Sequence, residues 1–119
     1  MPKIDISVKI KNYTEDTEYK TTGIITNKVL KYKEKDNTTT TYNYVDKCLI
    51  RNNEELYMKY IFNPKKETTG IIKIKSLKKD LNILIKTNKY KEEDNNIYIE
   101  YEIEKEKFIF GIEEIRWVY

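Results

Sequence analysis

Apolar and polar side chains alternate one by one through long stretches of this chain. In residues 3–11 every second residue is Ile or Val, and the residues between them are Lys, Asp or Ser. Residues 55–62, 81–85 and 97–104 repeat the alternation. A period of two places successive side chains on opposite faces of an extended strand, so each segment is predicted to be a strand with one face buried.

Weaker strand signals fill the rest of the chain. Residues 17–25, 28–34, 38–45 and 47–51 are rich in Thr and Tyr, which favour the pleated surface of a sheet. Asn, Asp and Pro separate the segments, so turn signals recur about every 8 to 12 residues, as in sandwiches and barrels of sequential hairpins. One helical turn is expected at most, at residues 76–79.

The predicted fold class is all-β, with residues 1–119 forming a single domain. A meander of about ten short strands leaves two exposed edges unless the sheet closes on itself. We therefore expect an antiparallel meander closed into a β-barrel of about eight to ten strands, whose interior holds side chains or one small ligand. Phe110 and Trp117 have opposite parity, so a β-bulge at Glu113-Glu114 is expected to turn both inward.

Charge and composition argue against several classes of protein. The 23 basic and 20 acidic residues are interspersed, so the chain lacks the clustered basic stripe of a nucleic-acid-binding domain. Abundant Lys, Ile, Asn and Tyr with no Ala or Gln fit the coding bias of an AT-rich genome. With no histidine and only Cys48, neither an internal disulfide nor a zinc site is expected, and no metal or cofactor is predicted.

No segment suggests export or a membrane. The N-terminal residues alternate instead of forming the apolar block of a signal peptide. No window approaches the about 20 apolar residues of a membrane helix. A lone cysteine fits a reducing compartment. We therefore expect a cytoplasmic protein that does not enter a membrane, and the sequence leaves its oligomeric state open.

Catalytic signatures are missing from the sequence. Histidine is the commonest general base and the usual partner of a nucleophilic serine or cysteine, and the chain has none. Glu100, Glu102 and Glu104 line one strand face, which is interpreted as a solvated surface. Three isolated glycines make no phosphate-binding loop. No catalytic residue is predicted, and a non-enzymatic protein is favoured.

Arg51 is the most informative charged residue. It follows the apolar residues 48–50 and has the parity of Leu49, so its guanidinium is expected to point into the barrel. A buried arginine must be paired or must face a water-filled cavity. Thr69, Thr87 and Tyr101 are the polar groups expected to face inward with it. Arg51 would then bind an anion or a ligand carboxylate, or close the barrel end structurally, and both interpretations stay open.

Eleven tyrosines support a second interpretation. Several adjoin lysines, as at Tyr32-Lys33 and Lys59-Tyr60, and aromatic platforms beside basic grooves bind single-stranded nucleic acid. Tyrosine is also an ordinary packing residue of β proteins. The alternative hypothesis is therefore an interaction module whose Tyr/Lys-rich outer face binds single-stranded nucleic acid or a protein, with nucleic acid disfavoured by the interspersed acids.

Seven short patterns follow one another in a distinctive order. They are Thr21-Thr22-Gly23, residues 30–32, Cys48-Leu49-Ile50-Arg51, Tyr60-Ile61-Phe62, Glu67-Thr68-Thr69-Gly70, Leu84-Ile85-Lys86-Thr87 and residues 97–102. In this order they resemble the YwiB-like family of small bacterial proteins. The resemblance implies a calycin-like, or lipocalin-like, β-barrel with Arg51 and Phe62 at places typical of the family, and it implies no established activity. The family tends to have a glycine shortly after the arginine, where this chain has Asn52-Asn53.

The leading hypothesis is a non-enzymatic protein that binds a small apolar or amphipathic ligand in the barrel. Inward apolar positions would hold the body of the ligand, and Arg51 would meet its polar head. The residues expected to line this site are Arg51, Met58, Tyr60, Phe62, Thr69, Thr87, Tyr101 and Phe108.

Overall fold

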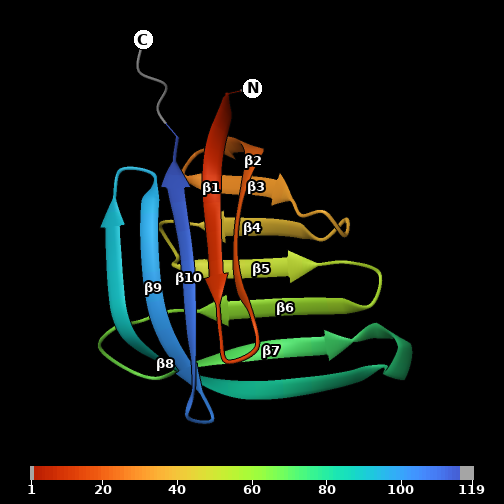
Figure 1. Cartoon of the computed structure of the whole chain (residues 1–119). Coiled ribbons are helices and arrows are strands. Elements are labelled where there is room, and N and C mark those ends of the chain that lie inside the picture. Colours follow the sequence, from red (N-terminus) through yellow and green to blue (C-terminus); the bar gives the residue numbers. More distant parts are fainter. Residues whose placement is uncertain (1, 116–119) are drawn as a thin grey trace.

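The alternating segments form ten antiparallel strands in the computed structural model, which describes residues 2–115 (Figure 1). The strands are β1 (Lys3–Lys11), β2 (Asp16–Thr26), β3 (Val29–Lys33), β4 (Thr39–Asn43), β5 (Cys48–Asn52), β6 (Leu56–Ile61), β7 (Thr68–Ile74), β8 (Lys79–Glu93), β9 (Asn96–Ile103) and β10 (Glu106–Glu114). A short 3₁₀ turn, η1 (Lys75–Leu77), connects β7 to β8 and overlaps the predicted helical turn.

Each strand pairs with the next one along the chain, and β1 also pairs with β10. The closing ladder runs from the pair Ile6 and Glu114 to the pair Lys11 and Ile109. The sheet therefore has the order β1-β10-β9-β8-β7-β6-β5-β4-β3-β2 and closes into a barrel. This confirms the predicted all-β, closed antiparallel meander, with a strand number at the upper end of the predicted range.

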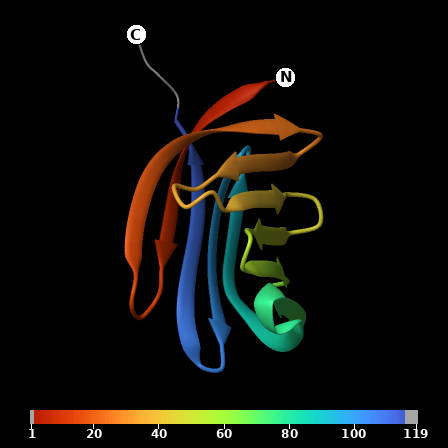
Figure 2. The same cartoon turned by 90° about the vertical axis from the view of Figure 1, so that its right-hand side faces the viewer.

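Two groups of strands cross each other to make the barrel (Figures 1 and 2). Strands β1, β2, β9 and β10 lie along one axis, with alternating directions, and β3 to β7 lie across that axis. Strand β8 belongs to both groups, because residues 79–85 pair with β7 and residues 86–93 pair with β9. A register shift between Thr87 and Lys89 makes Asn88 the extra residue of a bulge, which bends β8 at this corner.

The bulge expected at Glu113-Glu114 is not found in the described part of β10. Both residues pair with β1 in unbroken register, and Trp117, which motivated the expectation, lies outside the described residues. The bulge of β8 could not be recognised from a change of parity in the apolar residues, because the inward-facing residues on its two sides, Thr87 and Tyr90, both carry hydroxyl groups.

The second corner lies where β2 passes from β1 to β3. Residues 16–24 of β2 pair with β1, whereas only Ile24–Thr26 pair with β3. At the crossing, a Cβ added to Gly23 would lie 2.9 Å from Cδ1 of Leu30 and 2.9 Å from the carbonyl oxygen of Lys31. Glycine is required here because the two strands approach too closely for a side chain.

The inward faces of both groups of strands form one core. Its largest wholly buried side chains are Tyr42, Phe62, Ile6, Leu30, Ile85, Ile99, Ile112 and Val8. Leu81 was expected in the core with Ile83 and Ile85, but its side chain is 38% exposed. It lies at the open side of the barrel, which also holds the candidate site.

Candidate functional site

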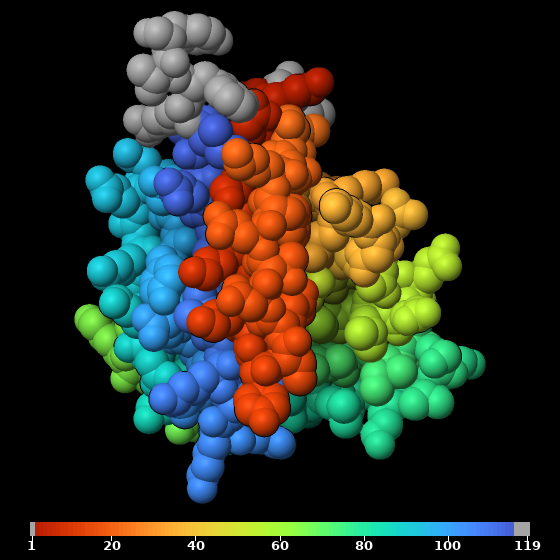
Figure 3. Space-filling view, viewed as in Figure 1, coloured from red at the N-terminus to blue at the C-terminus, as the bar shows by residue number. Residues whose placement is uncertain are grey.

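One side of the barrel is less tightly closed than the rest. Among the described residues, the stretch 16–22 of β2 pairs with β1 on one edge and with no strand on the other. This stretch and the turns after β3, β5 and β7 bound a region that we term the mouth. Figure 2 looks toward the mouth, and in the space-filling view β2 stands in front of it as a ridge beside β4 to β7 (Figure 3).

A continuous row of inward-facing residues crosses the mouth from β3 to β8. Cross-strand pairing links its members in order, and we term them the mouth row: Tyr32, Thr40, Arg51, Met58, Ile72 and Leu81. Its first half is polar and its second half is apolar. Tyr32 and Thr40 are buried, whereas the Arg51 side chain is 31% exposed, Met58 and Ile72 are half-buried, and Leu81 is 38% exposed.

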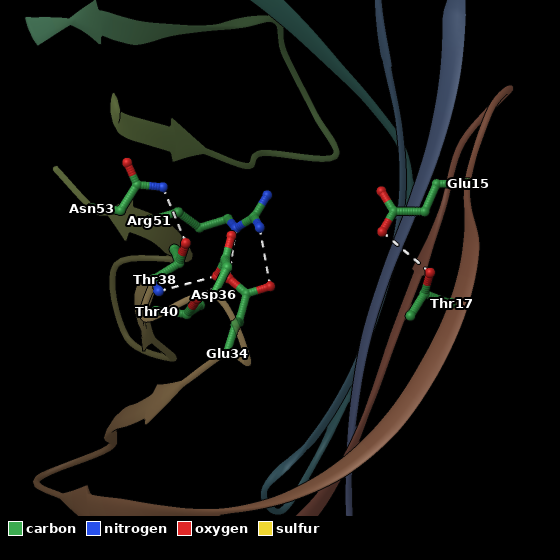
Figure 4. A network of polar contacts seen from close by, with 8 residues as sticks. All are labelled: Glu15, Thr17, Glu34, Asp36, Thr38, Thr40, Arg51 and Asn53. Carbon is green, nitrogen blue, oxygen red and sulfur yellow. Dashed lines mark hydrogen bonds and ion pairs between the residues drawn. The ribbon is translucent and has the colours of Figure 1, made fainter. Parts of the chain in front are cut away.

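Arg51 is held by Glu34, which follows β3 (Figure 4). Its Nε donates to Oε2 and its Nη2 donates to Oε1 of Glu34, both at 3.0 Å. The hydroxyl of Thr40, which lies between the two strands, also donates to Oε2 of Glu34, at 2.8 Å. Burial alone would lower the pKa of Arg51, but the charge and hydrogen bonds of Glu34 outweigh it and raise that pKa. The Arg51 guanidinium therefore stays charged, and its two hydrogen bonds to Glu34 are charge-assisted.

Tyrosine hydroxyls surround this ion pair. The Tyr19 hydroxyl, from β2, is buried beside Tyr32 and Glu34 but reaches hydrogen-bond geometry with no described residue. Burial raises the pKa of Tyr19, Tyr60 and Tyr101, and the charge of Arg51 opposes that rise in all three. The hydroxyls therefore remain protonated and can donate at neutral pH.

Asn53 forms hydrogen bonds that link the turns at the rim of the mouth. Its Nδ2 donates to the Thr38 hydroxyl at 3.0 Å, and its Oδ1 accepts from the amides of Glu55 and Leu56, both at 2.8 Å. The Lys75 ammonium, in η1, donates to the carbonyl oxygen of Asn53. One asparagine thus connects the turns after β3, β5 and β7. Neither Asn52 nor Asn53 is among the described residues with positive φ, so Asn53 shapes this turn through its side-chain hydrogen bonds and not through a left-handed backbone.

The sequence-predicted site residues divide into separate groups. Arg51 and Met58 are neighbours in the mouth row. The four predicted aromatic residues pack on one another deeper in the barrel: ring centroids are 6.5 Å apart for Tyr60 and Phe62, 4.9 Å for Phe62 and Tyr101, and 5.2 Å for the stacked Tyr101 and Phe108. We term this cluster the floor of the mouth, because Tyr60 and Tyr101 are buried and lie close enough to Arg51 for its charge to act on their hydroxyls.

The two predicted threonines lie apart from Arg51. Thr87 is buried as expected, and its hydroxyl accepts a hydrogen bond from the amide of Asn63 at 3.2 Å. The inward direction predicted for Thr69 is wrong. Thr69 is exposed on the outer face, paired with the exposed Leu84, and its neighbour Gly70 faces inward. Because Ile71 and Ile72 are both apolar, the sequence does not show which of the two faces inward, and a shift of one residue reverses the predicted direction of Thr69.

Several residues of the mouth escaped sequence reasoning. Glu34 has the parity of Leu30 and Tyr32, a signal that could have indicated an inward carboxylate. Tyr19 sits in a segment of alternating Thr and charged residues without an apolar stripe, so its inward direction had no hydrophobic marker.

Most tyrosines are interior residues, which weakens the Tyr/Lys outer-face hypothesis. Those on the inner face are Tyr19, Tyr32, Tyr42, Tyr44, Tyr60, Tyr90 and Tyr101. The hydroxyls of Tyr42 and Tyr90 form a hydrogen bond of 2.6 Å with each other. Among the described residues the outer surface keeps Tyr13, Tyr57 and Tyr98, the last two with lysine ammonium groups 5.8 Å from their rings.

Neither metal-binding clusters nor membrane-spanning helices are found between residues 2 and 115. No group of three or more Cys, Asp or Glu side chains in this range is arranged to hold a metal ion. No helix in it has the length and hydropathy needed to cross a bilayer.

Comparison with known proteins identifies a similar fold. No family model and no curated protein matches the sequence. The crystal structure of the ywiB protein from Bacillus subtilis matches with a TM-score of 0.61 and 17% sequence identity, covering 96% of this chain and 91% of that chain. The resemblance inferred from the short sequence patterns is thereby confirmed at the level of the fold: nearly the whole chain is similar to the ywiB barrel.

Proposed function

We propose that this protein binds a small amphipathic ligand in the mouth of the barrel, without catalysing a reaction. The supporting observation is the mouth row, in which a polar half and an apolar half lie side by side on one inward, partly exposed surface. Binding sites for small molecules combine an apolar lining with a few placed polar groups in this way.

The apolar half of the row leaves hydrophobic area in contact with water. Met58 and Ile72 are half-buried, and Leu81 is 38% exposed although it faces inward. Covering such area yields about 25 cal/mol for each Å² removed from water. An alkyl or ring system lying on these side chains is therefore favoured over solvent.

The aromatic cluster limits how deep a ligand can reach. Tyr60, Phe62, Tyr101 and Phe108 contact one another and belong to the core or pack directly against it. A ligand is therefore expected above this floor, between the mouth row and Tyr19 of β2, with its polar head toward Arg51.

Two leucines of β8 provide a matched test. Leu81 ends the mouth row, whereas Leu84 is 63% exposed on the outer face of the same strand. Fluorescence of the neutral probe N-phenyl-1-naphthylamine would report binding. We expect Leu81→Asp to weaken the probe at least tenfold and Leu84→Asp to leave its affinity within twofold of wild type.

The proposal fails if the probe does not bind, or if both variants behave alike. Native mass spectrometry of freshly purified protein complements the titration, since a retained small molecule would identify the ligand itself.

A second candidate function is partner binding on the outer face around Tyr98. A depression of about 760 Å³ there is lined by Lys9, Lys91, Tyr98 and Gly111, among others. Glu18 and Glu113 also line it, so a protein partner is favoured over a nucleic acid. Titration with single-stranded polynucleotide would support nucleic-acid binding if affinity falls steeply with salt.

A further inference from the structure

We propose that the polar head of the ligand is an uncharged hydrogen-bond acceptor, such as an amide or ester carbonyl, and not a carboxylate. This inference rests on the proposed function, because it concerns what the polar half of the mouth row recognises. A lone inward arginine would suggest an anionic ligand, but Arg51 is not alone.

The charges in the polar half of the row already balance. Nη2 and Nε of Arg51 face the two carboxylate oxygens of Glu34, both at 3.0 Å. An anion set against Arg51 would have the Glu34 carboxylate nearby, so attraction and repulsion largely cancel. The anion would still lose its hydration on entering. Asp36, on the turn after β3, places a second negative charge at the same rim and accepts from the Thr38 amide at 3.1 Å.

The same surroundings offer hydrogen-bond donors that lack acceptors. A guanidinium has five N–H groups, and Glu34 takes two of those of Arg51. The third nitrogen of Arg51 points away from Glu34 (Figure 4). Beside Tyr32 and Glu34, the buried Tyr19 hydroxyl has no hydrogen-bond partner of adequate geometry among the described residues. A neutral carbonyl oxygen would satisfy such donors without adding a charge.

Two ligands that differ only in the head group test this inference. Octanamide and octanoate have the same alkyl chain, and each can compete with N-phenyl-1-naphthylamine at pH 7. We expect octanamide to displace the probe at a concentration at least tenfold lower than octanoate. Equal or tighter binding of octanoate would overturn the inference and leave the proposed function standing. If the probe itself does not bind, the proposed function fails instead.

A charge-removing variant tests the role of Glu34 directly. Glu34→Gln keeps an oxygen acceptor for Arg51 but leaves the guanidinium charge uncompensated. We expect octanoate to bind this variant at least tenfold more tightly than wild type, with octanamide changed less than threefold. Glu54→Gln, on the exposed turn after β5, removes the same charge elsewhere and should leave the octanoate affinity unchanged.

An unchanged octanoate affinity in the folded Glu34→Gln variant would overturn the inference. If that variant does not fold, the wild-type comparison decides, with methyl octanoate as a second neutral head group. Methyl octanoate is then expected to compete as octanamide does, and competition no better than that of octanoate would count against the inference.

Discussion

Arg51 of β5 reaches across β4 to Glu34, and two parallel hydrogen bonds of 3.0 Å join the side chains. Thr40 of β4, between them, donates to the same carboxylate at 2.8 Å. Three strands that are already connected through their backbones are therefore connected again through side chains at the mouth. The pair fixes the guanidinium in place and also determines which charges a ligand would meet there.

Removing Arg51 should destabilise the protein. In Arg51→Met the Glu34 carboxylate, whose side chain is only 11% exposed, loses both charge-assisted hydrogen bonds. We expect the free energy of unfolding to fall by roughly 1–3 kcal/mol, as measured by urea titration. Lys33→Met removes a neighbouring exposed charge and should change it by less than about 0.5 kcal/mol. Equal stabilities of the two variants would argue against a structural role for the pair.

Two glycines offer a matched test of the corner between β2 and β3. A Cβ at Gly23 would meet the Lys31 carbonyl oxygen at 2.9 Å, whereas at Gly111 the nearest atom is 3.5 Å away. We expect Gly23→Ala to destabilise the fold by about 1–3 kcal/mol, because backbone must shift. Gly111→Ala should be neutral or slightly stabilising. Thermal unfolding followed by circular dichroism checks both, and similar melting temperatures would contradict the close approach.

Asn53 should contribute more to stability than an asparagine without such contacts. Asn53→Ala removes bonds to Thr38, Glu55 and Leu56 at once. We expect a loss of about 1–3 kcal/mol, together with faster hydrogen exchange at the amides of Glu55 and Leu56. Asn82→Ala, on the exposed outer face of β8, serves as the control. Unchanged exchange in Asn53→Ala would show that the turn does not depend on this side chain.

Alkaline pH should unfold the barrel cooperatively. Burial raises the pKa of Tyr19, Tyr42, Tyr60 and Tyr101 above the ordinary value of 10.0. Above that pH the unfolded chain releases tyrosine protons that the folded state retains, so stability is complete below pH 10 and falls as the pH rises further. Tyrosinate absorbance should therefore rise together with the loss of the β signal in circular dichroism. Full ionisation of the tyrosines in a folded barrel would refute this.

Sequence reasoning predicted the fold because side-chain direction follows strand parity. Ile4, Ile99 and Arg51 point inward as their alternation indicates. The prediction for Thr69 was wrong because consecutive apolar residues follow Gly70, and a slip of one residue reverses the face. Within the described residues, periodicity decided direction wherever the apolar set was unambiguous.

The candidate site was harder to predict, because it depends on which strands lie side by side. Parity alone turns both Arg51 and Glu34 inward. Their contact additionally requires the register of β3, β4 and β5, which the lengths of the intervening turns determine. The width of the mouth likewise depends on where β2 stops pairing with β3. Within residues 16–26, Gly23 is the only residue whose type indicates that point.

The pairing of β1 with β10 has a consequence for how the chain folds. Every other ladder of the barrel joins strands that are consecutive in the sequence, so it can form as a local hairpin within a short search. The ladder between Ile6 and Glu114 joins opposite ends of the chain and carries the largest loop-closure entropy. We expect the β1–β10 ladder to form last and to limit the rate of refolding, whereas the hairpins form early.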